Sequence, residues 1–215
     1  MKLMILICSG MTNISNSQYF AEKLIESFAE NDIQNVKSEI FYIFDHNNSD
    51  LIKKTKEYDN ILLIAPIYAG TVPSRILDYM KDFESEYNGD KNKSIYVIDN
   101  CGFYKFRSNA DIVTYRLWVK KVGLNWGGSF RISTGELMLN IKHMPKNKGP
   151  HKDMFRNMDI FAQKIVKNEY VELISYPVKF PRAVFMLLGN IVWYKSRKRG
   201  SFIPKYVIDG RSKSD

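Results

Sequence analysis

Hydrophobic and polar positions alternate along this chain in two recurring ways. Short continuous apolar runs, each about one strand long, occupy residues 3–8, 60–66 and 94–100. Between these runs lie longer segments in which apolar residues recur every three or four positions. Continuous runs are typical of strands buried on both faces, and the longer repeat is typical of amphipathic helices. The pattern therefore predicts strands that alternate with helices.

The alternation extends over most of the chain. We expect strands at 3–8, 36–44, 60–66, 94–100 and 127–133, and helices at 17–30, 74–87, 110–123 and 154–168. The second strand alternates less cleanly than the others, which favours a place nearer the sheet edge. Strands alternating with helices indicate an α/β fold with a parallel, doubly wound sheet. Five strands in this length predict a three-layer sandwich with strand order 2-1-3-4-5.

Composition divides the chain into two parts. It has 215 residues, 45% of them hydrophobic and 26% charged, which is the profile of a globular protein. We expect a main domain at residues 1–175 and a basic C-terminal extension at 176–215. The extension holds nine Lys or Arg against two Asp, and therefore most of the net charge of +9. A basic face for nucleic acid on the main domain is not indicated.

The extension contains a short apolar segment, residues 182–194, that predicts a helix. Lys195, Arg197, Lys198 and Arg199 follow it directly. Such a segment suits peripheral contact with an anionic membrane surface. It equally suits packing on the domain or on a partner subunit, with the cations complementing the helix dipole. The sequence leaves both interpretations open.

Neither a secretory signal nor a membrane span is predicted. The N-terminal apolar run is too short for a signal, and no run approaches the roughly 18 residues that a span needs. We therefore expect a cytoplasmic protein. Its two cysteines, Cys8 and Cys101, have no spacing typical of a disulfide framework or a zinc site and are expected to be small buried residues. His46, His143 and His151 are expected at the surface, and neither a catalytic acid–base pair nor a metal site is predicted.

The loop after the first predicted strand is made almost wholly of small hydrogen-bonding residues, from Ser9 to Ser17. Together with the N-terminus of the next helix, such a loop offers hydroxyl, amide and backbone N–H donors to a phosphate. It lacks the Lys of a Walker loop and the G-x-G-x-x-G of a dinucleotide site. The alternative is ordinary helix capping by Ser15 or Asn16.

Two further loops combine glycine with aromatic residues at the end of a predicted strand. One contains Pro66, Tyr68 and Gly70, and the other contains Gly102 and Tyr104. Bare backbone beside an aromatic ring suits a flat heterocycle. In a doubly wound sheet of this order all three loops meet at the carboxyl edge, where the strand order reverses. The three loops together therefore indicate a mononucleotide with a large planar base.

These loops resemble those of the flavodoxin-like NAD(P)H-dependent FMN reductases and related flavin oxidoreductases. The family's first loop is typically G-S-P-(K/R)-x-x-S-N-S, and this chain has CSGMTNISNS. The second is P-(V/I)-Y-(W/F/A)-G, matched by PIYAG, and the third is a glycine-containing loop after the fourth strand. The resemblance covers residues 1 to about 170. Met11 stands where Lys or Arg is common in the family.

The resemblance implies FMN as the cofactor and assigns residues to it. Those implied to hold the phosphate are Ser9, Met11, Asn13, Ser15, Asn16 and Ser17. Those implied to flank the isoalloxazine ring are Pro66, Ile67, Tyr68, Ala69 and Gly70, with Asn100, Gly102, Phe103 and Tyr104.

It also implies an activity. NADH or NADPH would supply hydride, and a quinone, a flavin, a nitro compound or a metal ion would accept the electrons. Relatives of this kind often form homodimers around the flavin, so a homodimer is expected. An FMN electron carrier of the flavodoxin type and a flavin-less binding module that keeps only the fold are the alternatives.

Overall fold

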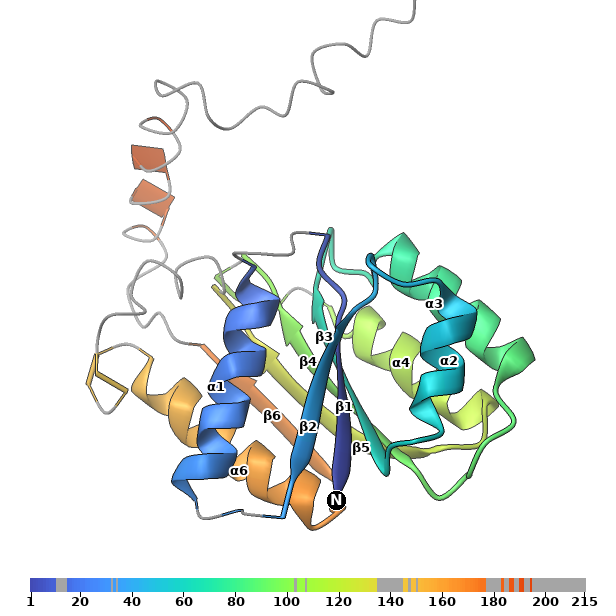
Figure 1. Cartoon of the computed structure of the whole chain (residues 1–215). Coiled ribbons are helices and arrows are strands. Elements are labelled where there is room, and N and C mark those ends of the chain that lie inside the picture. Colours follow the sequence, from blue (N-terminus) through green and yellow to red (C-terminus); the bar gives the residue numbers. More distant parts are fainter. Residues whose placement is uncertain are drawn as a thin grey trace, which may run out of the picture. The chain divides into compact units, whose positions relative to one another are not determined.

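A parallel sheet forms the centre of the larger of two units, Met1–Val178 (Figure 1). The structure is a computed structural model. It describes residues 1–10, 15–31, 33, 35–102, 104–106, 108–134, 145–146, 148–149 and 151–176, and residues 183, 186, 187, 190, 191 and 194 of the second unit, Lys179–Asp215. Within these residues no helix is long and apolar enough to cross a bilayer.

The sheet has the strand order β2-β1-β3-β4-β5-β6, and every neighbouring pair is parallel. Its strands are β1 (Lys2–Ile7), β2 (Lys37–Tyr42), β3 (Asn60–Pro66), β4 (Ser94–Asn100), β5 (Asn125–Ile132) and β6 (Val171–Ser175). The predicted order 2-1-3-4-5 is confirmed. The sequence pattern did not predict β6. This short edge strand has no continuous apolar run, and its residues Glu172 and Ile174 are exposed.

Helices cover both faces of the sheet. They are α1 (Asn16–Glu30), α2 (Asn48–Thr55), α3 (Ser74–Glu86), α4 (Ala110–Lys121) and α6 (Lys152–Val166). Figure 1 shows α1 and α6 on one face and α2, α3 and α4 on the other. The pattern did not predict α2, which is only eight residues long, and starts at an Asn47 cap whose side chain accepts a hydrogen bond from the Asp50 N–H.

Two apolar cores lie on the two sides of the sheet. Alternate residues of β1 divide between them: Met4 and Leu6 join the core under α2, α3 and α4, while Leu3, Ile5 and Ile7 join the core under α1 and α6. All five side chains are fully buried, as expected of a central parallel strand. This burial fixes β1 and places its end, where the first candidate loop starts, at the middle of the sheet.

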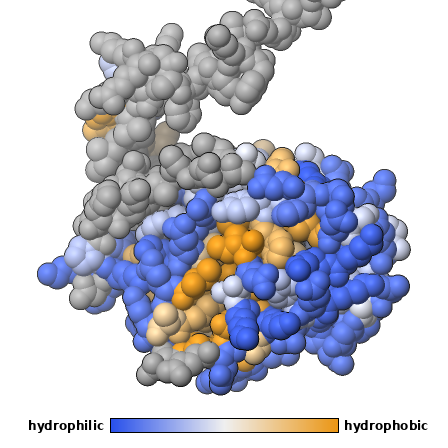
Figure 2. Space-filling view, in the orientation of Figure 1, coloured by the Kyte–Doolittle hydropathy of each residue, from blue (hydrophilic) through white to orange (hydrophobic). Residues whose placement is uncertain are grey.

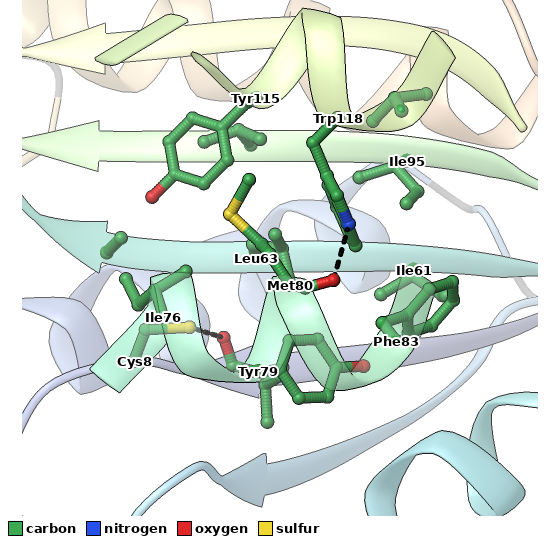
Figure 3. Close-up of a cluster of buried hydrophobic side chains, with 14 of the residues drawn as sticks. Cys8, Ile61, Leu63, Ile76, Tyr79, Met80, Phe83, Ile95, Tyr115 and Trp118 are labelled. Carbon is green, nitrogen blue, oxygen red and sulfur yellow. Dashed lines mark hydrogen bonds between the residues drawn. The ribbon is translucent and has the colours of Figure 1, made fainter. Parts of the chain in front are cut away.

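The core beneath α3 and α4 is shown in Figure 3. Trp118 of α4 donates its indole N–H to the Met80 carbonyl of α3 over 3.1 Å. Its ring lies edge-on to Phe83, with ring centroids 5.3 Å apart. The bond satisfies the one polar group of a buried indole, so α3 and α4 are held together without an orphaned donor.

A bulge in β5 depends on glycine. The β4–β5 pairing passes from Ile95 opposite Trp126 to Tyr96 opposite Gly128, so Gly127 is the extra residue. Gly128 has a φ of +118°, and a Cβ there would lie 1.8 Å from the Val171 carbonyl oxygen. Only glycine lets β6 approach β5 at this point.

The β2 edge is less covered than the rest of the sheet. Lys37 and Glu39 are exposed, which agrees with the predicted position nearer an edge. Figure 2 shows hydrophobic surface between α1 and β2. Ile25 of α1 and Ile40 of β2 are partly buried and pack against the core under α1 and α6.

Candidate functional site at the carboxyl edge of the sheet

The three candidate loops leave neighbouring strands at the same edge. Backbone pairing continues just past each strand end: the Cys8 N–H donates to the Ile64 carbonyl over 2.8 Å, and the Ile67 N–H donates to the Asn100 carbonyl over 2.8 Å. The Cys101 N–H likewise donates to the Ile132 carbonyl over 3.1 Å. The loops therefore start from a rigid, hydrogen-bonded edge.

The first loop leads into the N-terminus of α1. Ser15 is the cap: its Oγ accepts a hydrogen bond from the Gln18 N–H over 3.1 Å. Ser9, Ser15 and Ser17 are buried. Capping thus accounts for Ser15, and the positive end of the helix dipole lies at the same edge as the other two loops. Met11 and Asn13 lie outside the described residues.

The side chain of Asn16 carries a buried acceptor for which the described residues supply no donor. Among the described residues its Oδ1 has no hydrogen-bond partner, although the atom is shielded from solvent. A buried carbonyl oxygen without a donor is costly unless a ligand or an ordered water supplies one. The first turn of α1 therefore offers an acceptor as well as the partial positive charge of a helix terminus.

Asn100 ties the loops together. Its side-chain amide donates to Ser17 Oγ over 3.2 Å and to the Ala65 carbonyl over 3.0 Å. Asn100 ends β4, Ser17 lies in the first turn of α1, and Ala65 lies near the end of β3. One buried amide thus holds the end of the first loop and the starts of the other two loops in a fixed arrangement.

The second loop is a tight turn that displays a tyrosine. Ala69 and Gly70 have φ values of 52° and 79°, and the Thr71 N–H donates to the Tyr68 carbonyl over 3.0 Å. Two successive residues with positive φ, closed by this bond, form a type I′-like turn. Ile67 is buried and anchors the turn, whereas Tyr68 is 61% exposed. The aromatic ring is therefore presented at the carboxyl edge on a stiff backbone.

The third loop carries Gly102, which is exposed, and Tyr104, which is half-buried. Phe103 lies outside the described residues. Beyond them, the Phe106 ring stacks on the Arg131 guanidinium, 4.1 Å from ring centroid to guanidinium carbon. The loop is thereby attached to β5 as well as to β4.

A buried charge cluster beneath this loop was not predicted from the sequence. Arg131 of β5 is 4% exposed, and one of its guanidinium nitrogens donates to both Asp111 oxygens over 2.9 and 2.7 Å. The same guanidinium donates to Asn109 Oδ1 over 2.6 Å and to the Ser108 carbonyl over 3.1 Å. Arg131 therefore fixes the end of the third loop and the start of α4.

Asp99 is a second buried carboxyl beside the same guanidinium. Its Oδ2 lies 3.6 Å from Arg131 Nε, and among the described residues neither carboxyl oxygen has a hydrogen-bond partner. Burial, followed by the charge of Asp111, raises the pKa of Asp99 well above its usual range, and Arg131 offsets this only in part. One guanidinium serving two carboxyls leaves Asp99 better buried as the neutral acid.

Both cysteines are buried, and the two described histidines, His46 and His151, differ in exposure. Cys8 and Cys101 are buried, as predicted, and burial raises the pKa of the Cys8 thiol. His46 is exposed, but the expectation of a surface histidine is wrong for His151. Its side chain is buried, with Nε2 3.1 Å from the Pro145 carbonyl oxygen and the ring edge-on to Phe155. His143 and residues 135–144 lie outside the described part.

A pocket of about 380 Å³ opens at the opposite, amino edge of the sheet, lined by Met1, Lys2, Asn35, Lys37 and Asp59. It has no aromatic ring and no helix N-terminus among these residues. In the described part of the chain, no cluster of His, Cys, Asp and Glu is placed to hold a metal ion.

The carboxyl edge fits FMN on three observations. The helix N-terminus behind Ser15 suits a phosphate. The orphaned Asn16 Oδ1 can accept from a ribityl hydroxyl. Among the described residues, a Cβ at Gly70 would meet nothing closer than Ser108 Oγ at 4.0 Å, so a ring could approach the turn beside Tyr68.

Comparisons with known proteins show the fold. Neither a scan of protein-family models nor a search of curated proteins gave a match. Among solved structures, an FMN-dependent NADH-azoreductase from Bacillus anthracis str. Ames Ancestor in complex with FMN has a TM-score of 0.57 at 12% identity, covering 76% of this chain and 99% of that one. A short-chain flavodoxin associated with a non-canonical PDU bacterial microcompartment has a TM-score of 0.53 at 19% identity, covering 77% and 97%. An NADPH-quinone reductase from P. pentosaceus has 0.52 at 15%, covering 75% and 96%.

Proposed function

We propose that the chain binds FMN at the carboxyl edge of its sheet and acts as an oxidoreductase. Its flavodoxin-like α/β fold, which flavodoxins and FMN- or NADPH-dependent reductases share, supports this proposal. The chain takes hydride from NADH or NADPH and reduces a small acceptor: a quinone, a free flavin, a nitro compound or a metal ion. Bound FMN would supply the hydride and electron chemistry, and the protein would hold and orient it.

The observation that carries the proposal is the Asn100 clamp. By bonding to Ser17 and to Ala65, it brings the helix N-terminus, the tyrosine turn and the third loop to one place. A phosphate needs the first of these, and a flat ring needs the other two. Ordinary helix capping would account for Ser15 alone. It would not account for the other two loops at the same edge of the sheet.

Each part of the site has a distinct role in this proposal. The N-terminus of α1 stabilises the phosphate through its dipole and backbone N–H groups. Tyr68 would contact the ring, and the turn through Ala69 and Gly70 would offer main-chain groups to it. Arg131 keeps the third loop in position through its bond to the Ser108 carbonyl and its contact with Phe106.

The test is the visible absorption spectrum of the purified full chain during titration with FMN, followed by anaerobic NADH and then NADPH. The proposal predicts a flavin band that shifts on binding and bleaches with at least one nucleotide. A band that shifts and does not bleach would identify an electron carrier reduced by another protein. No shift would favour a binding module that keeps only the fold.

Two comparisons locate the binding within the site. FMN should bind more tightly than riboflavin, because only FMN places a phosphate at the α1 N-terminus. Tyr68→Ala should weaken FMN binding roughly 2- to 13-fold, the equivalent of one aromatic stacking contact. Tyr170→Ala is the matched control, since Tyr170 is similarly exposed (59%, against 61% for Tyr68) but precedes β6 at the opposite edge.

A homodimer remains a prediction from the resemblance. Light scattering of the FMN-loaded protein measures it: a mass near twice 25.1 kDa is expected, and a mass near 25.1 kDa would contradict it.

A further inference from the structure

The outer edge of β2 carries backbone groups that no strand receives. β2 stands at the end of the sheet, so among the described residues only β1 pairs with it, and in Figure 1 none of the labelled helices crosses its outer edge. The N–H groups of Lys37 and Ile43 donate toward β1, to carbonyl oxygens 2.9 and 3.0 Å away. Backbone groups alternate between the two sides of a strand, so those that point away from β1 belong to Ser38, Ile40 and Tyr42.

This edge carries one charge of each sign. Lys37 and Glu39 are exposed, and neither has an ion-pair partner among the described residues. Glu39 Oε2 accepts a hydrogen bond from the Tyr58 hydroxyl over 2.7 Å. Charges on an edge strand commonly keep other strands away. A lysine two residues before a glutamate repels a second copy of itself only in registers that bring like charges together, so the register decides the effect.

One register of self-pairing matches both charges. Two copies of β2 related by a two-fold axis run antiparallel, and each register is centred on one residue. In the register centred on Ser38, Lys37 of each copy lies opposite Glu39 of the other. In a register centred on Lys37 or Glu39, that residue lies opposite itself and two like charges meet. In the register centred on Ile40, Glu39 lies opposite Phe41.

The face of β2 toward α1 fits the same register. Val36, directly before β2, and Ile40 are partly buried and pack against the core under α1 and α6, where Figure 2 shows hydrophobic surface between α1 and β2. In the register centred on Ser38, Val36 of each copy lies opposite Ile40 of the other, which makes an apolar pair on this face. These residues also carry the outward backbone groups, so about six hydrogen bonds would form.

We propose that two copies of this chain associate through β2, antiparallel about a two-fold axis at Ser38, so that their sheets become one. The other edge of the sheet offers no such match, because the one charge of β6, Glu172, is already paired with Arg116. The contact occupies residues 36–40, toward the amino end of β2, whereas the three candidate loops follow the carboxyl ends of β1, β3 and β4. This interface therefore differs from a dimer around the flavin.

Cysteine cross-linking of the full chain tests the register. Ser38→Cys should form a disulfide-linked dimer under mild oxidation, because opposite residues of a hydrogen-bonded pair have Cα atoms about 5.5 Å apart, within the range of a disulfide. Ile40→Cys is the matched control: its two copies would lie more than about 10 Å apart and should stay unlinked. The native Cys8 and Cys101 are buried. Linkage of Ile40→Cys alone, or of neither variant, would contradict this register.

Charge reversal tests what holds the two copies together. Sedimentation equilibrium of the full chain, with and without FMN, should show a dimer that forms as concentration rises. Lys37→Glu should weaken it on the order of 30-fold, because two repulsions replace two attractions. Adding Glu39→Lys should return the affinity to within about threefold of the unaltered chain. Lys120→Glu makes the same change of charge on α4 and should have no effect.

The proposal is wrong if the unaltered chain keeps a mass of 25.1 kDa at every concentration, or if the double reversal dimerises no better than Lys37→Glu alone. A dimer that forms only with FMN and ignores these changes would instead place the interface at the flavin site. FMN titration of the same variants should match that of the unaltered chain. A failure of FMN binding would therefore be seen separately from a failure of the β2 pairing.

Discussion

Replacement of Asn100 probes the clamp that unites the three loops. Asn100→Ala removes two hydrogen bonds, to Ser17 Oγ and to the Ala65 carbonyl. A buried neutral hydrogen bond contributes about 1 kcal/mol, so we expect the free energy of unfolding to fall by about 2 kcal/mol. If that loss were expressed wholly in the loop arrangement, FMN would bind up to about 30-fold more weakly.

Asn100→Asp gives a sharper form of the same experiment. The aspartate would replace the amide donor by an oxygen facing the Ala65 carbonyl, in a site that is only 5% exposed. Because its charge would be buried without a partner, we expect the free energy of unfolding to fall by at least about 3 kcal/mol at pH 7. Protonation of the aspartate near pH 4 should restore part of this loss.

Urea unfolding followed by tryptophan fluorescence measures both Asn100 variants, and FMN titration measures the site. Asn125→Ala is the control. Asn125 also donates from its side chain to a backbone carbonyl, that of Asn92 at 3.0 Å, but it is exposed and lies at the amino edge. Asn125→Ala should lower the free energy of unfolding by less than about 1 kcal/mol and leave FMN binding unchanged. Asn100 does not clamp the loops if Asn100→Ala lowers the free energy of unfolding by less than the control does, or if Asn100→Asp lowers it by no more than Asn100→Ala.

Three further changes test the parts around the site. Arg131→Met should lower the free energy of unfolding in urea by about 3 to 5 kcal/mol, because Asp111 would be buried without its cation. Adding Asp111→Asn should recover part of this loss, and no recovery would contradict the pairing of Arg131 with Asp111. The pKa of Asp99 is raised in the folded state. Its contribution to stability is therefore present at low pH and is lost as the pH rises above 3.8, the pKa of this carboxyl in the unfolded chain. The free energy of unfolding falls by about 1.4 kcal/mol per pH unit until the folded-state pKa is reached. In urea unfolding, Asp99→Asn should therefore be more stable than the unaltered chain at pH 7.5 and should lose this advantage at pH 4.5. If the two proteins differed by the same free energy of unfolding at both pH values, Asp99 would be ionised when folded. Gly128→Ala should displace β6, since its Cβ would lie 1.8 Å from the Val171 carbonyl oxygen, and hydrogen exchange should show lost protection in that strand; normal protection would refute the clash.

Much of the fold follows from local pattern. Strands β1, β3 and β4 are buried on both faces, so each contains a run of at least four apolar residues that is visible without knowledge of its neighbours. The helix predicted at residues 17–30 is confirmed as α1, and its residues Phe20, Leu24 and Phe28, which recur every four positions, are buried. β6 and α2 were missed because they are short and half polar, and their formation depends on pairing with β5 or packing on the sheet.

The candidate site was only partly accessible to such reasoning. Loop composition singled out the edge, and Asn100 was placed beside the ring, but its bonds to Ser17 and Ala65 join residues that are distant in sequence. Asp99 and Arg131 show the same limit. A signal existed, because each is the only charged residue of its strand, and strands four and five are neighbours in the predicted order.

The central claim is that one FMN site lies where the three loops meet, and its most direct test is an NMR titration of isotope-labelled protein with FMN, followed through backbone amide shifts. The account predicts saturable shifts at Ser9, at Ser15 to Ser17, at Ile67 to Gly70 and at Cys101 to Tyr104, with the amino edge unchanged. Shifts that gather instead around Lys2, Asn35, Lys37 and Asp59, or no shifts at all, would contradict it.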